Sequence, residues 1–407
     1  MTSIRKFMFP ESKKYLTNIF LILLLTVLAL YARKCLFPIT SRDYYHFLVP
    51  WYEQLKNNGG FAAIGMSIGD YTPMYYYILA ILTYIPLNSL AAIKLVSCIA
   101  DVILAVLGYK IVNEVTGDST KSLVAYGTLL FMPSVILNSA AWGQCDAIFT
   151  LFILASIYFL LKNRDWAAAI CFSISFSFKI QAIFFAPVLL VLLIKRKIRV
   201  RTVLALPAIY ILSIMPAWIA GGNFYRLLTI YLRQPLQYSI LNMYIQNAWA
   251  LVKDIDSDEL GKAGIFFAGG VVILSLFWIC RSKFRFRKET IIIFSGFYTL
   301  LLPFILPYMH ERYYYLPAVI IAIYAIINFE NIWAFLIMEF CLFQAEIHNL
   351  FGKEAMDFNF SFILVTVVLL HYVRAVYKLL NEPDDIRPEI TGTETDKSEE
   401  LICKSEA

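Results

Sequence analysis

Long apolar segments recur along almost the whole chain, and they limit its possible folds more than any other feature. Twelve of them fall near residues 15–32, 89–110, 121–138, 147–161, 166–178, 181–194, 202–220, 263–280, 289–307, 314–329, 331–345 and 360–378. A helix of about 20 apolar residues crosses the ~30 Å hydrocarbon core of a bilayer. The pattern therefore predicts an all-α fold: a polytopic helical membrane protein with about 12 transmembrane helices.

Composition excludes a soluble protein. Hydrophobic residues make up 60% of the 407 residues and charged residues only 16%, whereas soluble domains are about 45–50% apolar and about 25% charged. The chain has no GxGxxG or Walker pattern, and its seven cysteines form no CxxC pair. We therefore expect no nucleotide pocket, no cofactor, no metal site and no nucleic-acid partner, and membrane lipids around much of the surface.

Basic clusters predict the orientation of the chain. One cluster comprises Lys195, Arg196, Lys197, Arg199 and Arg201, and another comprises Arg281, Lys283, Arg285, Arg287 and Lys288. Cytoplasmic loops are enriched in Lys and Arg, so we place both clusters and the basic N-terminus in the cytoplasm. Residues 74–86 are too few to cross a ~30 Å core as a helix. Four regions then lie on the far side: 33–88, 138–146, 221–261 and 307–313.

The chain divides into a membrane domain, residues 1–380, and a tail, residues 381–407. The first far-side loop, about 33–88, is rich in aromatic residues and is expected to contain amphipathic helices. The tail holds nine acidic and three basic residues without apolar periodicity, so we expect a disordered cytoplasmic segment. Arg33 is a basic residue on the predicted far side, although basic residues favour the cytoplasmic side. Snorkelling or contact with a lipid phosphate would explain its position. Asp101 lies inside an apolar segment, where we expect a buried hydrogen-bonding role.

Ionisable residues in or beside the far-side regions are candidates for a functional site. They are Asp43, Asp70, Asp146, Lys179, His310, Glu311 and Arg312. Ionisable groups at bilayer depth are costly, so their presence favours a function. If these residues converge, they combine carboxylates with cations in one pocket at the membrane surface.

Each candidate also has a purely structural interpretation. Asp43 can cap the amphipathic stretch 44–58, Asp70 can shape the turn that follows it, and Asp146 can cap the helix after it. Lys179 can snorkel from a helix end. Residues 310–312 can form a local ion pair at the interface. These alternatives stay open at the level of sequence.

These residue types suit glycosyl transfer from a lipid-phosphate sugar. An acceptor hydroxyl loses a proton as it attacks the anomeric carbon, and one positioned carboxylate can accept that proton. The leaving polyprenyl phosphate needs charge stabilisation, which Arg, Lys and His supply. Such a donor keeps its tail in lipid while its head group meets a polar loop, which explains why so hydrophobic a protein would act on sugars.

Four sequence blocks resemble the GT-C superfamily of integral-membrane glycosyltransferases. The nearest pattern is that of bacterial proteins related to the mannosyltransferase that adds the second mannose of GPI anchors. The blocks are Asp43-Tyr44 with Asp70-Tyr71-Thr72-Pro73, Trp142-Gly143-Gln144-Cys145-Asp146, Phe178-Lys179-Ile180-Gln181, and His310-Glu311-Arg312-Tyr313. Thr72 departs from a looser likeness to dolichol-pathway glucosyltransferases, which have Pro at that position.

The resemblance implies an inverting transferase that uses a polyprenyl-phosphate-linked monosaccharide, with a mannose-like hexose as the first guess, and a glycan or lipid-linked acceptor. Asp43 would be the base and Asp146 would orient a sugar. Asp70, Lys179, His310, Glu311 and Arg312 would bind substrate and its phosphate. The likeness to bacterial proteins also implies a bacterial plasma membrane with the site facing outward. A transporter or flippase, or a polymerase, of lipid-linked glycans remains the alternative.

Overall fold

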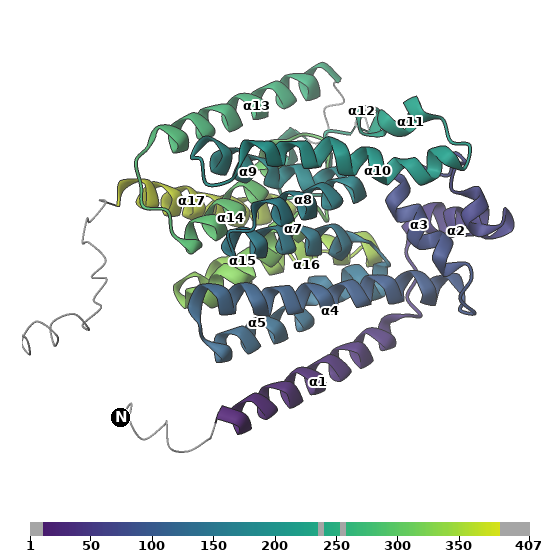
Figure 1. The fold of residues 1–407 in the computed structure, drawn as a ribbon, viewed down its shortest axis with the longest axis horizontal. Coiled ribbons are helices and arrows are strands. Elements are labelled where there is room, and N and C mark those ends of the chain that lie inside the picture. Colours follow the sequence, from purple (N-terminus) through teal and green to yellow (C-terminus); the bar gives the residue numbers. More distant parts are fainter. Residues whose placement is uncertain (1–10, 235–239, 253–257, 383–407) are drawn as a thin grey trace, which may run out of the picture.

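The computed structural model describes residues 11–234, 240–252 and 258–382, which form a helical bundle (Figure 1). The long helices are α1 (Glu11–Leu36), α4 (Ser89–Thr116), α10 (Ala205–Ile219), α13 (Asp258–Arg281), α14 (Lys288–Ile305), α16 (Ile332–Phe351) and α17 (Phe358–Asn381). Within the described ranges, the strands are β1 (Asn242–Met243) and β2 (Met309–His310), which pair in parallel. The prediction of an all-α membrane fold is confirmed.

Shorter helices complete the bundle. They are α3 (Pro73–Leu82), α5 (Ser119–Phe131), α6 (Pro133–Ile136) followed by η4 (Leu137–Trp142), α7 (Asp146–Leu161), α8 (Asp165–Phe178), η5 (Ile180–Phe185) with α9 (Ala186–Ile194), and α15 (Tyr315–Ile327). The first loop folds into η2 (Tyr44–Leu48), α2 (Val49–Asn57) and η3 (Gly60–Ala63) before α3. Connecting turns form η6 (Val200–Leu204), α11 (Phe224–Leu228), α12 (Ile230–Arg233), η8 (Ala248–Val252) and η9 (Phe329–Asn331).

Each of the twelve predicted apolar segments coincides with a helix or with consecutive helices. Among the described residues, seven helices are long and apolar enough to cross a membrane, or up to eight if α5 and the α6–η4 pair, bent by 48°, form one span. The other four segments correspond to α7, α8, η5–α9 and α15, which are shorter. Length therefore supports eight crossings at most, and twelve remains a prediction.

Two of the shorter helices, α7 and α15, lie largely inside the bundle, and charged residues lie at or near the ends of α7, α8 and α15. Every residue of α15 is buried, and α7 packs extensively on α4 and α8. Asp146 opens α7, Lys179 directly follows α8, and Arg312 lies three residues before α15. Because helices surrounded by protein can end within the membrane, these ends bring charged groups to one place in the bundle.

The two basic clusters share one end of the bundle. The Lys195 Nζ donates to the Ser282 carbonyl at 2.5 Å, so the α9–η6 and α13–α14 connections are adjacent. The α13–α14 connection lies at the same end as the start of α1, opposite to α2 and α3 (Figure 1). We call these the basic end and the site end. The acidic tail lies outside the described residues from 383 onward.

Arg33 lies in the protein interior, so both sequence interpretations of this residue are wrong. Its Nε donates to the Asp101 Oδ2 at 2.8 Å, and the two side chains are 1% and 0% exposed. Asp101 also accepts a hydrogen bond from the Ser139 hydroxyl at 2.5 Å, which confirms its buried hydrogen-bonding role. This pair fastens α1, which is otherwise largely exposed, to α4 and η4.

Candidate functional site

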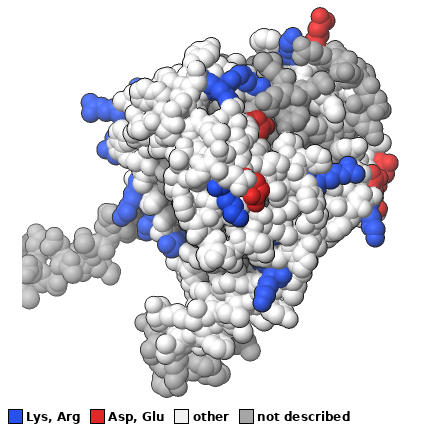
Figure 2. Space-filling view, turned by 90° about the vertical axis from the view of Figure 1, so that its right-hand side faces the viewer, with Lys and Arg blue, Asp and Glu red and all other residues white. Residues whose placement is uncertain are grey.

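Seen from the site end, the surface is mostly uncharged, and acidic side chains with basic neighbours lie near its middle (Figure 2). Asp43 lies in the first loop and directly precedes η2. Its side chain does not cap that helical turn. Instead, its Oδ2 accepts hydrogen bonds from the Trp142 Nε1 at 3.0 Å and the Gln144 Nε2 at 2.7 Å. The capping interpretation of Asp43 is therefore wrong, and this side chain joins the first loop to residues 142–144.

Asp146 is held in the interior by polar groups from three elements. The chain reaches it through Gly143, whose φ of +79° falls in the left-handed region that glycine adopts freely. The Asp146 carboxylate, 1% exposed, pairs with the Lys179 Nζ and accepts a hydrogen bond from the Asn138 Nδ2 at 3.1 Å. Its Oδ2 also lies 3.5 Å from the Arg312 Nε.

Lys179 is itself the extended residue that separates α8 from η5. The Thr72 hydroxyl lies beside that turn and is shared between the carbonyls of Ser177 at 2.6 Å and Phe178 at 3.1 Å. A proline at position 72 could not donate these bonds. Lys179 is 6% exposed and its ammonium lies 5.8 Å from the centre of the Tyr71 ring, so it does not snorkel. The departure from the glucosyltransferase pattern thus has a structural use.

The segment 310–312 is positioned by the short strand pair, in which Met243 lies opposite His310. Arg312 extends from it between the acids: its guanidinium NH1 is 3.7 Å from the Asp43 Oδ2 and 3.3 Å from the Glu311 Oε1. The guanidinium carbon also lies 5.3 Å from the centre of the Trp142 ring. Residues 310–312 therefore form more than a local ion pair, because Arg312 reaches two other parts of the chain.

Glu311 and Asp70 differ in their proton affinity. Burial favours the protonated form of Glu311, but the hydrogen bond and charge of His310 and the charge of Arg312 outweigh it, so the pKa of Glu311 is lowered. Asn349 also donates to the Glu311 Oε1 at 3.3 Å. Burial raises the pKa of Asp70, and the nearby positive charges of Arg312, His310 and Lys179 only partly oppose it.

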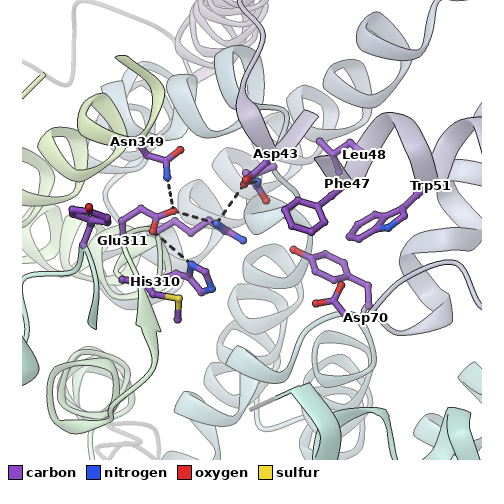
Figure 3. Close-up of a pocket in the computed structure, with 13 residues that line it drawn as sticks. Asp43, Phe47, Leu48, Trp51, Asp70, His310, Glu311 and Asn349 are labelled. Atoms are coloured by element: carbon purple, nitrogen blue, oxygen red, sulfur yellow. Dashed lines mark hydrogen bonds and ion pairs between the residues drawn. The ribbon is translucent and has the colours of Figure 1, made fainter. Parts of the chain in front are cut away.

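Two adjoining cavities meet at this cluster. The first, of about 220 Å³, is lined by Asp43, Phe47, Leu48, Trp51, Asp70, Tyr71, Gln144, Met243, Tyr244, His310, Glu311, Arg312 and Asn349 (Figure 3). The second, of about 240 Å³, is lined by polar residues, among them Lys179 and Gln181, and by apolar ones such as Ile183, Phe184 and Ile265. Asp70, Tyr71, His310 and Arg312 line both cavities, which we call the outer cavity and the apolar cavity.

All seven predicted site residues thus lie in one connected cluster, although their roles remain proposals. Sequence reasoning missed three amides and acids that contact it: Asn138, Glu346 and Asn349. Glu346 and Asn349 both belong to α16, in the run CLFQAEIHNLF. Polar residues that interrupt an otherwise apolar helix were the available signal.

The model of glycosyltransferase family 87 matches residues 70–307, more than half of the chain. No curated protein matches the chain. The matched range includes Asp70, Asp146 and Lys179. Asp43 and Arg312 lie outside the matched range but contact residues within it, since Asp43 binds Gln144 and Arg312 pairs with Asp146.

Proposed function

The chain belongs to glycosyltransferase family 87, and we propose that it transfers a mannose-like hexose, with inversion, from a polyprenyl-phosphate donor to a glycan or lipid-linked acceptor at the outer face of the plasma membrane. One observation carries the proposal. A carboxylate that is partly open to a cavity and two buried cations lie in one cluster, around two cavities with a common wall.

Asp43 is the base in this proposal. Two N–H donors hold its Oδ2, which fixes the orientation of the carboxylate, and its side chain is 24% exposed to the outer cavity that it lines. Phe47 and Trp51 line the same cavity and offer aromatic faces to a sugar. An acceptor hydroxyl bound there gives its proton to Asp43 as its oxygen attacks the anomeric carbon.

Lys179, His310 and Arg312 line the apolar cavity and receive the donor phosphate. Cations stabilise the charge that develops on the leaving phosphate oxygen. The apolar lining includes Ile183 and Ile265, which are 44% and 43% exposed and would meet a polyprenyl chain that enters from the membrane. This cavity therefore combines the two features of the donor, an anionic head and an apolar tail.

The arrangement of the cavities favours inversion. Inversion by a single displacement requires the acceptor and the leaving phosphate on opposite faces of the anomeric carbon. In our proposal the donor sugar lies at the wall that the cavities share, next to Asp70 and Tyr71, with the acceptor on one side and the phosphate on the other. Asp146 acts from behind this wall by holding Lys179 and Arg312.

The test is a transfer assay with purified protein in lipid nanodiscs. A panel of polyprenyl-phosphate sugars is supplied with cell-envelope lipids and glycans, and released polyprenyl phosphate is measured. We expect release from the mannosyl donor, and a loss of about 10²–10⁴-fold in D43N. The thermal unfolding of D43N should match that of the wild type. Full activity of folded D43N would remove Asp43 as the base, and no release from any donor would overturn the donor class.

A further inference from the structure

A second acid lies directly behind Asp146. Glu346, in α16, is 0% exposed, and its Oε1 accepts a hydrogen bond from the Asn138 Nδ2 at 3.3 Å. The same Asn138 nitrogen donates to the Asp146 Oδ2 at 3.1 Å. One amide group, itself fully buried, therefore bridges two carboxyl groups. Its two N–H bonds are both used, one for each acid.

The two acids differ in their charge partners. Asp146 pairs with Lys179 and lies 3.5 Å from Arg312. In the described part of the chain, no ion pair involves Glu346. A carboxylate that is buried without a cation is very costly, so such a group instead keeps its proton.

The unpaired atoms around Glu346 indicate where that proton lies. The Glu346 Oε2 and the Asn138 Oδ1 are both buried, and neither has a hydrogen-bond partner. Both atoms are acceptors if Glu346 is ionised. A proton on the Glu346 Oε2 gives each of them a partner, since a carboxylic acid and a primary amide pair through two hydrogen bonds. One proton thus removes two buried unsatisfied groups, each of which would cost about 1–3 kcal/mol.

We propose that Glu346 is a neutral carboxylic acid that locks the Asn138 amide and thereby acts as a positioning residue for Asp146. The inference rests on the proposed function, in which Asp146 holds the cations that receive the donor phosphate. With its amide locked, Asn138 keeps an N–H directed at Asp146. A neutral acid also adds no negative charge beside Lys179 and Arg312, so it does not compete with the phosphate for them.

Kinetics of two substitutions separate this role from a general structural one. In E346Q the side chain stays neutral and can make the same two bonds to Asn138, so we expect kcat and the KM for the donor within about threefold of the wild type. In E346L both bonds are lost, and we expect the KM to rise at least fivefold. A mere loss of folded protein would lower the rate without changing the KM. E346Q as impaired as E346L would overturn the proposal.

Glu339 provides a matched control on the same helix. It is also buried, but its carboxyl oxygens accept bonds from the Ser134 N–H at 2.8 Å and hydroxyl at 2.6 Å, and not from Asn138. E339L is therefore expected to leave the KM for the donor unchanged, even if it lowers the yield of folded protein. An equal rise of the KM in E339L and E346L would overturn a specific role of Glu346.

Infrared spectroscopy tests the protonation without any transfer assay. The difference spectrum of the wild type minus E346Q, at neutral pH, should contain the carbonyl stretching band of a protonated carboxylic acid. The band of Glu346 should also be present in the spectrum of E339Q, because that variant removes only the Glu339 carboxyl. Its absence from the difference spectrum of the wild type minus E346Q would overturn the neutral state of Glu346. Because the measurement needs no donor or acceptor, it decides this proposal even where the proposed transfer reaction fails.

Discussion

Arg312 is the basic residue of the cluster that approaches three of its acidic residues. It is 9% exposed, and its guanidinium approaches Asp43, Asp146 and Glu311 while lying over the Trp142 ring. A planar guanidinium can serve several acceptors and an aromatic face at once, whereas an ammonium is a point charge. The geometry therefore predicts that lysine cannot replace this residue, although it keeps the charge.

In R312K we expect the KM for the donor to rise by about tenfold or more, because a charge-assisted contact is worth about 1.5–3 kcal/mol. Donor titrations with the purified variant measure this. Arg199 is a matched control, since it pairs with Asp165 at 2.5 Å at the basic end of the bundle and is 67% exposed. R199K should leave the KM unchanged. Equal values for R312K and the wild type would contradict a phosphate contact by Arg312.

Asp70 allows a prediction about pH. Its pKa is raised by burial, and a group with a higher pKa in the folded state stabilises the fold only where it is protonated. That contribution is lost as the pH rises through the folded pKa. D70N should therefore unfold at no lower temperature than the wild type at neutral pH, and its advantage should shrink towards about pH 4. Thermal unfolding in detergent across this range measures it, and a less stable D70N at neutral pH would contradict it.

At the scale of residues, charge in polar loops was a good guide to the site. The seven candidates were found because each is ionisable and lies in a loop between predicted apolar segments. Asn138 was missed because its amide is uncharged, and Glu346 because it follows the apolar segment 331–345 in the same helix. Asp43 could either cap its own helical turn or contact a distant part of the chain. Which of the two occurs depends on the position of Trp142, 99 residues away in the sequence. Local patterns carry no information about that distance.

Among the elements, α1 is joined to the bundle by a buried ion pair between Arg33 and Asp101. Arg33 NH1 also donates to the Leu130 carbonyl at 2.9 Å, so the contact joins α1 to both α4 and α5. The removal of one partner from a buried pair leaves an uncompensated charge, which costs about 3–5 kcal/mol. Replacement of both partners by apolar residues avoids that cost.

D101L is therefore expected to lower the unfolding temperature and the yield of inserted protein strongly. The double variant R33L/D101L should be more stable than D101L, because it leaves no buried guanidinium unpaired. Thermal unfolding of the purified variants in detergent compares them. If the double variant is no more stable than D101L, Arg33 does not depend on Asp101 for its compensation.

Element positions followed from hydropathy, but their lengths and bends did not. Each apolar segment became helical because an apolar environment forces the backbone to satisfy its own hydrogen bonds. Hydropathy cannot distinguish a crossing helix from one surrounded by protein, such as α15, in which all 13 residues are buried. The break between α5 and α6 follows from Pro133. It was not predicted because Pro133 lies inside the continuous apolar segment 121–138.

For the whole molecule, the separation of the basic end from the site end is the basis for its orientation. The α9–η6 and α13–α14 connections meet through Lys195 and Ser282, while the acids and cations of the cluster gather near α2 and α3 at the other end. Basic residues are retained on the cytoplasmic side. This asymmetry predicts that the cavities open outward, where a lipid-linked donor and a cell-envelope acceptor would meet.

Single cysteines in a cysteine-free variant test this orientation. Ser67 lies in the first loop and Lys283 lies in the α13–α14 connection, and both are exposed. We expect a membrane-impermeant maleimide to label S67C in intact cells and K283C only after permeabilisation. The reverse pattern would place the cavities in the cytoplasm, where the proposed outward transfer could not occur. Labelling of both from one side would contradict the bundle itself, because its two ends would then not lie across a membrane.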